Sequence, residues 1–336
     1  MTLSQFRLGL MSGALAMLAG CADTRPYTQA YTQATGPWQS WQVPVSTPSP
    51  LLGKIWSYKD NAFITPDALA KHMAAVDFAL LGESHDNADH HRLQGWMVSA
   101  IANEGRQPAV VWEMFDTGQS DALATFQAGK PDHADALGTA VQWEKTGWPQ
   151  WPLYQPIAEA SLSSGLTMYA GDPPVKLVRA VGKKDFSVLP AGQSKKLLLD
   201  RSLATDLQNA LQTQIVKSHC NLIPATATGP MYRGQRLRDA SMAMHMVEKG
   251  ARDGAILIAG TGHVRQDRAV PWYLRQLRPG KTVSSLMFVG VTDKDTDPVA
   301  LIPTDPNGKP VADYAWFTPK VVRKDPCIAL KKRFAK

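Results

Sequence analysis

The sequence predicts an α/β protein whose mainly parallel sheet is flanked by helices, and three apolar segments support this prediction. Residues 78–81, 109–112 and 255–259 are short apolar runs, and helical patterns separate them along the chain. Runs of this kind are typical of strands that are buried on both faces, as in parallel sheets. The first and third runs both end in Gly-x-x-His, at Gly82 to His85 and at Gly260 to His263. Two matched strand ends about 180 residues apart argue against coincidence.

The remaining elements of the first half are predicted from periodicity and from helix signals. Thr65-Pro66-Asp67 opens a helix to about residue 75, and Gly105 ends a helix whose apolar stripe includes Leu93 and Met97. The further predictions are a strand or hairpin over 51–64, a helix over 88–103, a helical region over 118–145, a helix over 156–163 and a strand over 166–171.

The second half opens with a helical insertion at about 190–250, before the last strands. We expect helices over 193–217 and 230–249, and then a return to the α/β pattern with a helix over 269–277 and a strand over 282–291. Residues 313–317 are predicted as a last, edge strand. The five main strands should centre on Leu80, Val111, Met168, Ile258 and Phe288.

The composition is that of an ordinary globular protein with a basic end. Hydrophobic residues make up 44% of the 336 residues, charged residues make up 19%, and the formal net charge is +7. The excess of positive charge collects in the tail, residues 321–336. Such a tail favours anionic lipid or acidic ligands, or is simply a solvated terminus. We find no nucleic-acid-binding motif, so no nucleic-acid partner is expected.

The chain begins with an export signal. Residues 1–20 combine Arg7 with a short apolar stretch, and Leu18-Ala-Gly-Cys21 resembles the bacterial lipobox, in which the cysteine is lipidated. That resemblance implies several acyl chains on Cys21, and Ala22 favours the outer membrane under the general sorting rule. Residues 21–50 are predicted to be a tether, and residues 51–320 the folded domain.

Two cysteines remain once Cys21 is assigned to lipid. An even pair in an oxidising compartment predicts a disulfide between Cys220 and Cys327, and two unpaired thiols are the alternative.

The strand ends carry the candidate functional residues. If the apolar strands are parallel neighbours, Glu83, His85, Glu113 and His263 converge on one rim of the sheet, where open α/β sheets bind ligands. Two histidines and two carboxylates suit a divalent metal ion with an open coordination position. The alternative is that each histidine only caps nearby backbone groups.

Other residues near these motifs are candidates of a second kind. His90 and His91 point about 100° apart on a helix, and His90 is the better candidate because it lies beside the apolar stripe. The aromatic run at 143–154 is either core or a wall for a flat ligand, with Tyr154 as a phenolate donor to iron.

At this point the motifs resemble a known family. The chain is similar to the ChaN-like haem-binding lipoproteins of the Tiki superfamily, whose relatives include erythromycin esterases and Tiki proteases. The similarity covers about residues 50–290. It rests on these segments: Leu-Leu-Gly-Glu-Ser-His-Asp-Asn, Trp-Glu-Met-Phe, Trp-Pro-Leu-Tyr-Gln-Pro-Ile, His-Cys-Asn-Leu-Ile-Pro, Gln-Arg-Leu-Arg-Asp-Ala-Ser-Met-Ala and Gly-Thr-Gly-His-Val-Arg.

The family resemblance implies haem binding in iron uptake at the bacterial outer membrane. It also implies two haems stacked across a homodimer, and an outer-membrane haem receptor as a partner. For the iron we expect Tyr154, His90 or His263, and for the haem propionates Arg92, Arg265 or Arg268. The flat wall of such a site is expected from Trp148, Trp151, Tyr154, Trp272 and Tyr273.

The wider superfamily implies an alternative, a metal-dependent hydrolase. In that case Glu83 or Glu113 would activate a water on a metal ion held partly by His85 and His263. Both interpretations stay open on the sequence alone.

Overall fold

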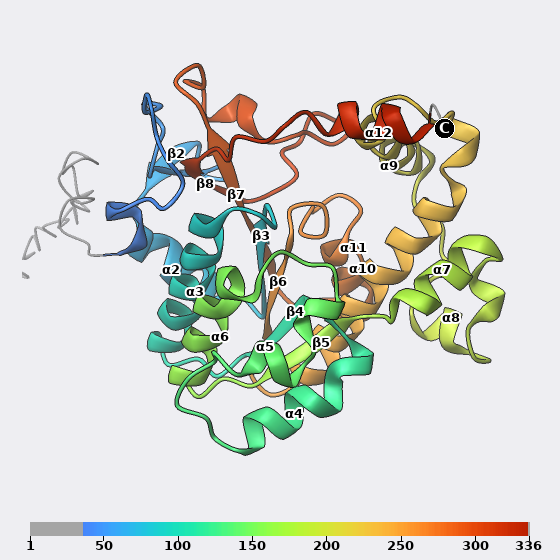
Figure 1. Cartoon of the computed structure of the whole chain (residues 1–336), viewed down its shortest axis with the longest axis horizontal. Coiled ribbons are helices and arrows are strands. Elements are labelled where there is room, and N and C mark those ends of the chain that lie inside the picture. Colours follow the sequence, from blue (N-terminus) through green and yellow to red (C-terminus); the bar gives the residue numbers. More distant parts are fainter. Residues whose placement is uncertain (1–35, 335–336) are drawn as a thin grey trace, which may run out of the picture.

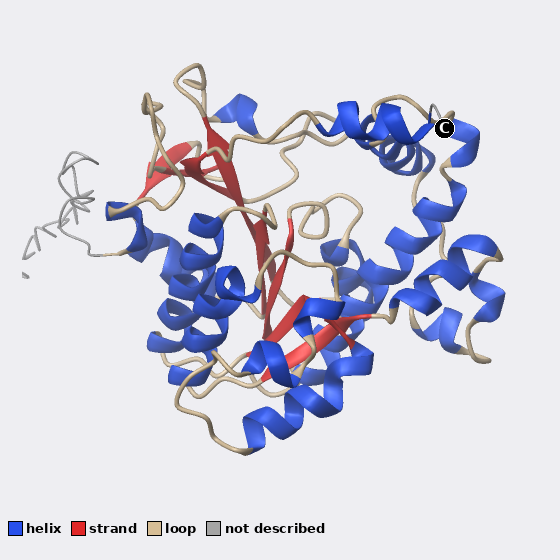
Figure 2. Ribbon diagram, in the orientation of Figure 1, coloured by secondary structure: helices blue, strands red, loops and turns tan. Residues whose placement is uncertain are grey.

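The computed structural model describes residues 36–334 and consists of one eight-stranded sheet with helices on both faces (Figures 1 and 2). The strands are β1 Ile55–Ser57, β2 Ala62–Ile64, β3 Phe78–Glu83, β4 Ala109–Asp116, β5 Met168–Asp172, β6 Ala255–Gly260, β7 Val283–Val291 and β8 Tyr314–Pro319. The helices are α2 Pro66–Ala74, α3 Ala88–Asn103, α4 Ser120–Ala128, α5 Leu137–Ala140, α6 Trp151–Ser163, α7 Val175–Lys183, α8 Gln193–Lys196, α9 Thr205–Ser218, α10 Gly229–Lys249, α11 Val270–Leu277 and α12 Pro326–Phe334. The signal segment 1–20 and Cys21 lie outside the described residues.

The sheet order is β2-β1-β8-β7-β3-β6-β4-β5. The six strands from β8 to β5 are parallel, and β1 and β2 add an antiparallel hairpin at one end. All five predicted main strands therefore lie in one sheet, as expected. The prediction that residues 313–317 form an edge strand is wrong, because β8 pairs with β7 on one side and with β1 on the other.

The two faces of the sheet are covered by different helices. Helices α2, α3 and α6 cover one face, and α7, α10 and α11 cover the other (Figure 1). The core strands are buried along their whole length, which explains why they appear as unbroken apolar runs.

The predicted helical insertion is only partly an insertion. Helix α10 packs against β4, β5 and β6, so it is the crossover that returns the chain to the sheet. The helix expected over 193–217 is broken, since Leu198 has a left-handed φ of 55° between α8 and α9. The helical region expected over 118–145 is likewise split into α4, α5 and a short 3-10 turn.

Both ends of the described chain are attached to the domain. The segment at 36–43, predicted as tether, packs on α3: Trp38 is buried against Trp96 and Trp316, and the amides of Gln42 and Val43 donate to Asp89. Cys220 and Cys327 are joined by a disulfide, which ties α12 to the end of α9. No helix within residues 36–334 is long and apolar enough to cross a membrane.

Candidate functional site

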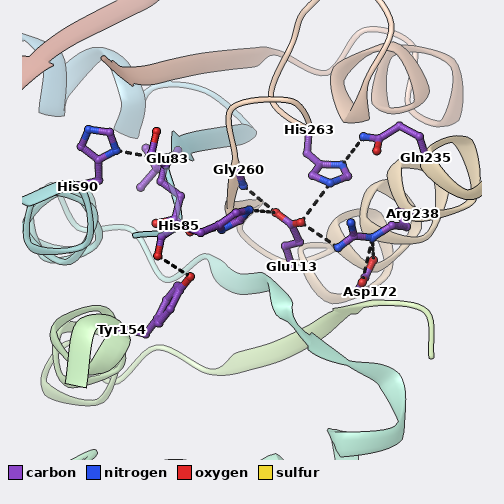
Figure 3. Close-up of polar contacts among 12 residues, drawn as sticks. Glu83, His85, His90, Glu113, Tyr154, Asp172, Gln235, Arg238, Gly260 and His263 are labelled. Carbon is purple, nitrogen blue, oxygen red and sulfur yellow. Dashed lines mark hydrogen bonds and ion pairs between the residues drawn. The ribbon is translucent and has the colours of Figure 1, made fainter. Parts of the chain in front are cut away.

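Three neighbouring strands bring the predicted site residues together. Strand β6 pairs with β3 on one side and β4 on the other, so that Glu83 lies opposite Gly260 and Trp112 opposite Ile258. The side chains of Glu83, His85, Glu113 and His263 therefore meet at the carboxyl edge of the sheet (Figure 3). The convergence that the sequence predicted is present.

Glu113 lies at the centre of a buried ionic network. Its Oε1 accepts hydrogen bonds from Arg238 Nη2 at 2.8 Å and from His263 Nε2 at 3.1 Å, and its Oε2 accepts from the Gly260 amide at 2.7 Å. Burial by itself would raise the pKa of Glu113, but the charges of His263 and Arg238 outweigh it and hold the pKa well below its usual value. Glu113 is therefore an ionised anchor whose oxygens are already engaged.

His263 is held between two carboxylates. Its Nδ1 lies 2.6 Å from Asp239 Oδ1, and the Gln235 amide lies 3.1 Å from the same ring nitrogen. Burial would lower the pKa of His263, yet Glu113 and Asp239 together raise that pKa to about 10. The ring is a buried imidazolium with both N–H groups in use, and a role for His263 as a donor to iron stays a prediction.

His85 is the histidine that faces open space. Its Nδ1 lies 2.8 Å from Glu83 Oε1, which fixes the ring, and its side chain is 34% exposed. Nε2 lies 3.9 Å from Glu113 Oε2, beyond hydrogen-bonding distance. Burial lowers the pKa of His85 while the hydrogen bond to Glu83 and the charge of Glu113 raise it, with a net increase. Glu83 is buried and its second oxygen contacts His91, so it acts as the partner that orients His85.

Three functional side chains on α10 were not assigned a role from the sequence. Arg238 bridges Glu113 and Asp172, and Asp239 and Gln235 contact His263. The signal was there, because positions 235, 238 and 239 share one face of a helix. Burial raises the pKa of Asp172 to about 6, against the opposing charge of Arg238.

A pocket of about 640 Å³ opens above this network. The rim residue His85 and the indole of Trp148 form one wall, with ring centroids 4.7 Å apart. Helix α9 contributes the opposite wall through Leu211, Gln214 and Ile215. The volume is within the usual range for small-molecule sites.

Two predicted iron donors, His90 and Tyr154, are buried and already paired. His90 is fully buried; its Nδ1 accepts from the Ser84 amide and its Nε2 donates to Thr318 Oγ1 at 2.8 Å. Burial lowers the pKa of His90 to about 3. Tyr154 is also fully buried, and its hydroxyl donates to the His85 carbonyl. Its ring packs on His91 and Trp143, so most of the aromatic run is core.

The predicted propionate partners fall into two groups. Arg92 donates to Ser40 and Asp89 and does not line the pocket. Arg268 lines the pocket, and Arg265 lines a second pocket beside it. Of the five aromatic residues expected to form a flat wall, Trp148 does so. The other four pack elsewhere: Trp151, Tyr154, Trp272 and Tyr273.

The four predicted metal ligands bond to one another and to Arg238, and do not form an open ligand set. Among residues 36–334 no group of three or more His, Cys, Asp or Glu side chains is arranged to hold a metal ion. The expectation of a divalent metal therefore finds no support in the donor geometry.

Together, the fold and site define an α/β protein with a ligand pocket at the carboxyl edge of its parallel strands. The family model described as haem-binding uptake, Tiki superfamily, ChaN matches residues 69–274, more than half of the chain, and the chain belongs to this family. No curated protein shows significant sequence similarity to this chain.

A solved structure shares the fold, and two others are similar to a lower degree. A structure described as cofacial heme binding to ChaN of Campylobacter jejuni is similar with a TM-score of 0.61 and 18% identity, covering 78% of this chain and 95% of that one. The type III effector HopBA1 has a TM-score of 0.43 and 12% identity, covering 75% and 92%. The erythromycin esterase EreC in its open conformation has a TM-score of 0.39 and 14% identity, covering 77% and 80%.

Proposed function

We propose that this chain is a haem-binding lipoprotein of iron acquisition, anchored at the bacterial outer membrane through Cys21. Membership of the haem-binding uptake family supports haem as the ligand. The pocket at the carboxyl edge of the sheet is the place where we expect haem to bind. The observation that carries the proposal is His85, which lines the pocket and is 34% exposed while its Nδ1 is held by Glu83.

The residues in the pocket suit haem. A neutral imidazole whose other nitrogen is fixed by a carboxylate is a strong axial donor to haem iron. Trp148 adds a flat apolar wall beside His85, which suits the face of the macrocycle. We assign iron binding to His85, in place of the buried Tyr154, His90 and His263.

The open pocket favours a pair of haems across a homodimer. A single open pocket leaves part of an apolar macrocycle in water, and pairing two protomers would cover it. Haemin should therefore shift the chain from monomer to dimer in sedimentation velocity, and an unchanged sedimentation coefficient would contradict this part of the proposal. An outer-membrane haem receptor fits the same role as a partner.

Titration with haemin tests the main proposal. The purified chain should give a saturable Soret shift, and His85→Ala should abolish that shift or weaken binding at least about tenfold. The matched control is His133→Ala, because His133 is a largely exposed histidine outside the pocket. An identical titration in His85→Ala would show that the iron site is elsewhere.

Membrane attachment has its own test. Cys21→Ser should move the chain from the membrane fraction to the soluble fraction and prevent labelling by radioactive palmitate. Cys220→Ser should still be labelled, since Cys220 is joined to Cys327. Unchanged fractionation of Cys21→Ser would remove the anchor from the proposal.

A second candidate function is ester or peptide hydrolysis. The pair of Glu83 and His85 at a pocket is a general-base arrangement, in which His85, oriented by Glu83, would take a proton from water. Turnover of aryl esters that is lost in His85→Ala but kept in His133→Ala would support it. A divalent metal ion should not be required, given the pairing of Glu113 and His263.

A further inference from the structure

A second pocket continues the first one along the carboxyl edge of the sheet. It has a volume of about 690 Å³ and is lined by the end of β7, the loop at 301–306 and helix α9. The two pockets share five lining residues: Ser84, Gln214, Thr261, Gly262 and Arg268. We call the pair of pockets the edge groove.

Two arginines in the wall of this second pocket share one carboxylate. Arg265 donates to Asp267 from Nε at 3.0 Å and from Nη2 at 2.7 Å, and Arg268 Nη1 donates to the same carboxylate at 2.7 Å. Arg265 is only 7% exposed and Arg268 only 4%. Two guanidinium groups that share one carboxylate carry a net charge of +1 between them, and Asp239 is a further carboxylate that acts on Arg268.

The other charged groups of the second pocket do not remove this excess. Lys217 also lines it, and Asp305 is the carboxylate in the lining, held by the amides of Asn307 and Lys309. Counted with Asp267, the second pocket has three cations and two carboxylates in or behind its lining, and Asp239, which also acts on Arg268, lines the first pocket. Burial and then the charge of Arg265 lower the pKa of Arg268, and the carboxylates of Asp267 and Asp239 oppose this shift without reversing it.

The floor beside these cations is apolar. Met287, Phe288 and Val289 of β7 and Leu301 and Ile302 of the following loop line the same pocket. Apolar surface next to two buried guanidinium groups is suited to a ligand that carries a carboxylate on an apolar body.

We propose that Arg265 and Arg268 form a carboxylate-binding subsite that takes a haem propionate while His85 faces the iron. The subsite rests on the proposed function and adds to it the group that orients the ligand in the edge groove. Gln214 of α9 accepts a hydrogen bond from Arg268, so ligand binding at the subsite also involves this helix.

Metal-free porphyrins test the subsite without the iron. Protoporphyrin and its dimethyl ester share the macrocycle and differ in their free carboxylates, and their binding to the purified chain is followed by tryptophan quenching. The free acid should bind about tenfold tighter than the ester. Arg268→Gln should bring this ratio close to one by weakening binding of the free acid more than binding of the ester, and Arg268→Lys should retain most of the ratio.

The controls separate the subsite from net charge and from misfolding. Arg252→Gln removes one positive charge from a pocket at the opposite end of the strands and should leave the ratio unchanged. If Arg268→Gln fails to fold, Lys217→Gln at an exposed position should reduce the ratio in part.

Each outcome can be assigned to one proposal. Equal binding of acid and ester together with a normal haemin Soret shift overturns the subsite and leaves haem binding intact. A tenfold preference for the acid without a haemin shift supports the subsite and contradicts iron binding at His85. Failure of every porphyrin to bind contradicts both proposals.

Discussion

At the scale of single residues, the site is a chain of alternating charges. Asp239, His263, Glu113, Arg238 and Asp172 follow one another, each within hydrogen-bonding distance of the next. Each cation has a carboxylate on both sides, which is the condition under which ionised groups can be buried. The network fixes the floor of the pocket and leaves His85 as the group that faces the ligand.

His263 should stabilise the fold in a pH-dependent way. Its pKa is raised from 6.5 to about 10, so its contribution is fully present below about pH 6.5 and is lost as the pH rises toward 10. His263→Gln leaves Glu113 and Asp239 without their shared cation and should cost about 3–5 kcal/mol at pH 6. Urea unfolding at pH 6, 8 and 10 measures both effects.

The matched control for this prediction is His133→Gln, because the side chain of His133 is 78% exposed. Wild type and the control should lose stability between pH 6.5 and 10, and His263→Gln should lack that decline. The same slope in all three proteins would show that His263 is not a buried imidazolium.

Gly260 is needed for the position of His85. A Cβ at residue 260 would lie 2.8 Å from His85 Nε2, closer than real contacts allow, and 3.6 Å from Glu113 Oε2. Because the His85 ring is partly exposed, it can move aside at little cost. Gly260→Ala should therefore lower the haemin affinity at least about tenfold and change the melting temperature little. A variant with wild-type affinity would contradict the close packing described here.

At the scale of elements, helix α3 holds the first motif against the sheet. Asn87 caps it, because its side chain accepts from the amides of Asp89 and His90. Gly95 on the same helix approaches α6 so closely that a Cβ there would lie 2.6 Å from the Pro156 carbonyl oxygen. Helix α6 in turn carries Tyr154, which bonds to the His85 carbonyl.

Gly95→Ala should reverse the usual effect of this substitution. In the middle of a helix, alanine normally stabilises by about 0.5–1 kcal/mol relative to glycine. Here the methyl group meets backbone, which cannot rotate away, so we expect destabilisation by about 1–3 kcal/mol in urea unfolding. Ala100→Gly in the same helix should destabilise by propensity alone, about 1 kcal/mol or less. A more stable Gly95→Ala would show that α3 and α6 are farther apart.

Strands were predicted better than helix limits, and the reason is physical. The parallel strands are buried on both faces, so nearly every position in them is apolar, and this run of apolar residues can be recognised in the sequence. The break after α8 depends on the left-handed conformation of Leu198. Leucine rarely adopts this conformation, so the sequence around it does not predict the break. The place of β8 inside the sheet depends on a hairpin more than 200 residues earlier in the chain.

At the scale of the whole molecule, the convergence of the site could be predicted and its chemistry only in part. Repeated Gly-x-x-His motifs at strand ends placed His85 and His263 on one edge. The sequence could not show that α10 would bring Arg238 and Asp239 to the same place and convert His263 into an imidazolium. Nor could it show that Tyr154 and His90 lie on the core side of their helices, because exposure depends on which neighbours pack there.

The C-terminal segment after β8 lies along one side of the edge groove. After β8 the chain runs past the site, where Arg323 forms an ion pair with Asp86, and both residues line the first pocket. It then enters α12, which Cys327 ties to Cys220 at the end of α9 (Figure 1). A strap at residues 320–327 is thus fixed at the two walls of the pocket, one beside His85 and the other on α9.

Removal of the disulfide should loosen the strap and expose the pocket. A Cys220→Ser, Cys327→Ser double variant loses a disulfide between cysteines that are 107 residues apart in the sequence. Its free energy of unfolding should be about 2–4 kcal/mol lower. With Arg323 as its remaining fixed point, the strap should open more often, and diethyl pyrocarbonate should modify His85 several-fold faster than in the oxidised protein. Arg323→Ala with the disulfide intact should give a smaller increase, because an exposed ion pair contributes about 1 kcal/mol or less. Peptide mapping of the modified histidines measures this rate, with the exposed His133 as internal reference. Equal rates at His85 in the wild type and the double variant would show that the strap does not limit access to the groove.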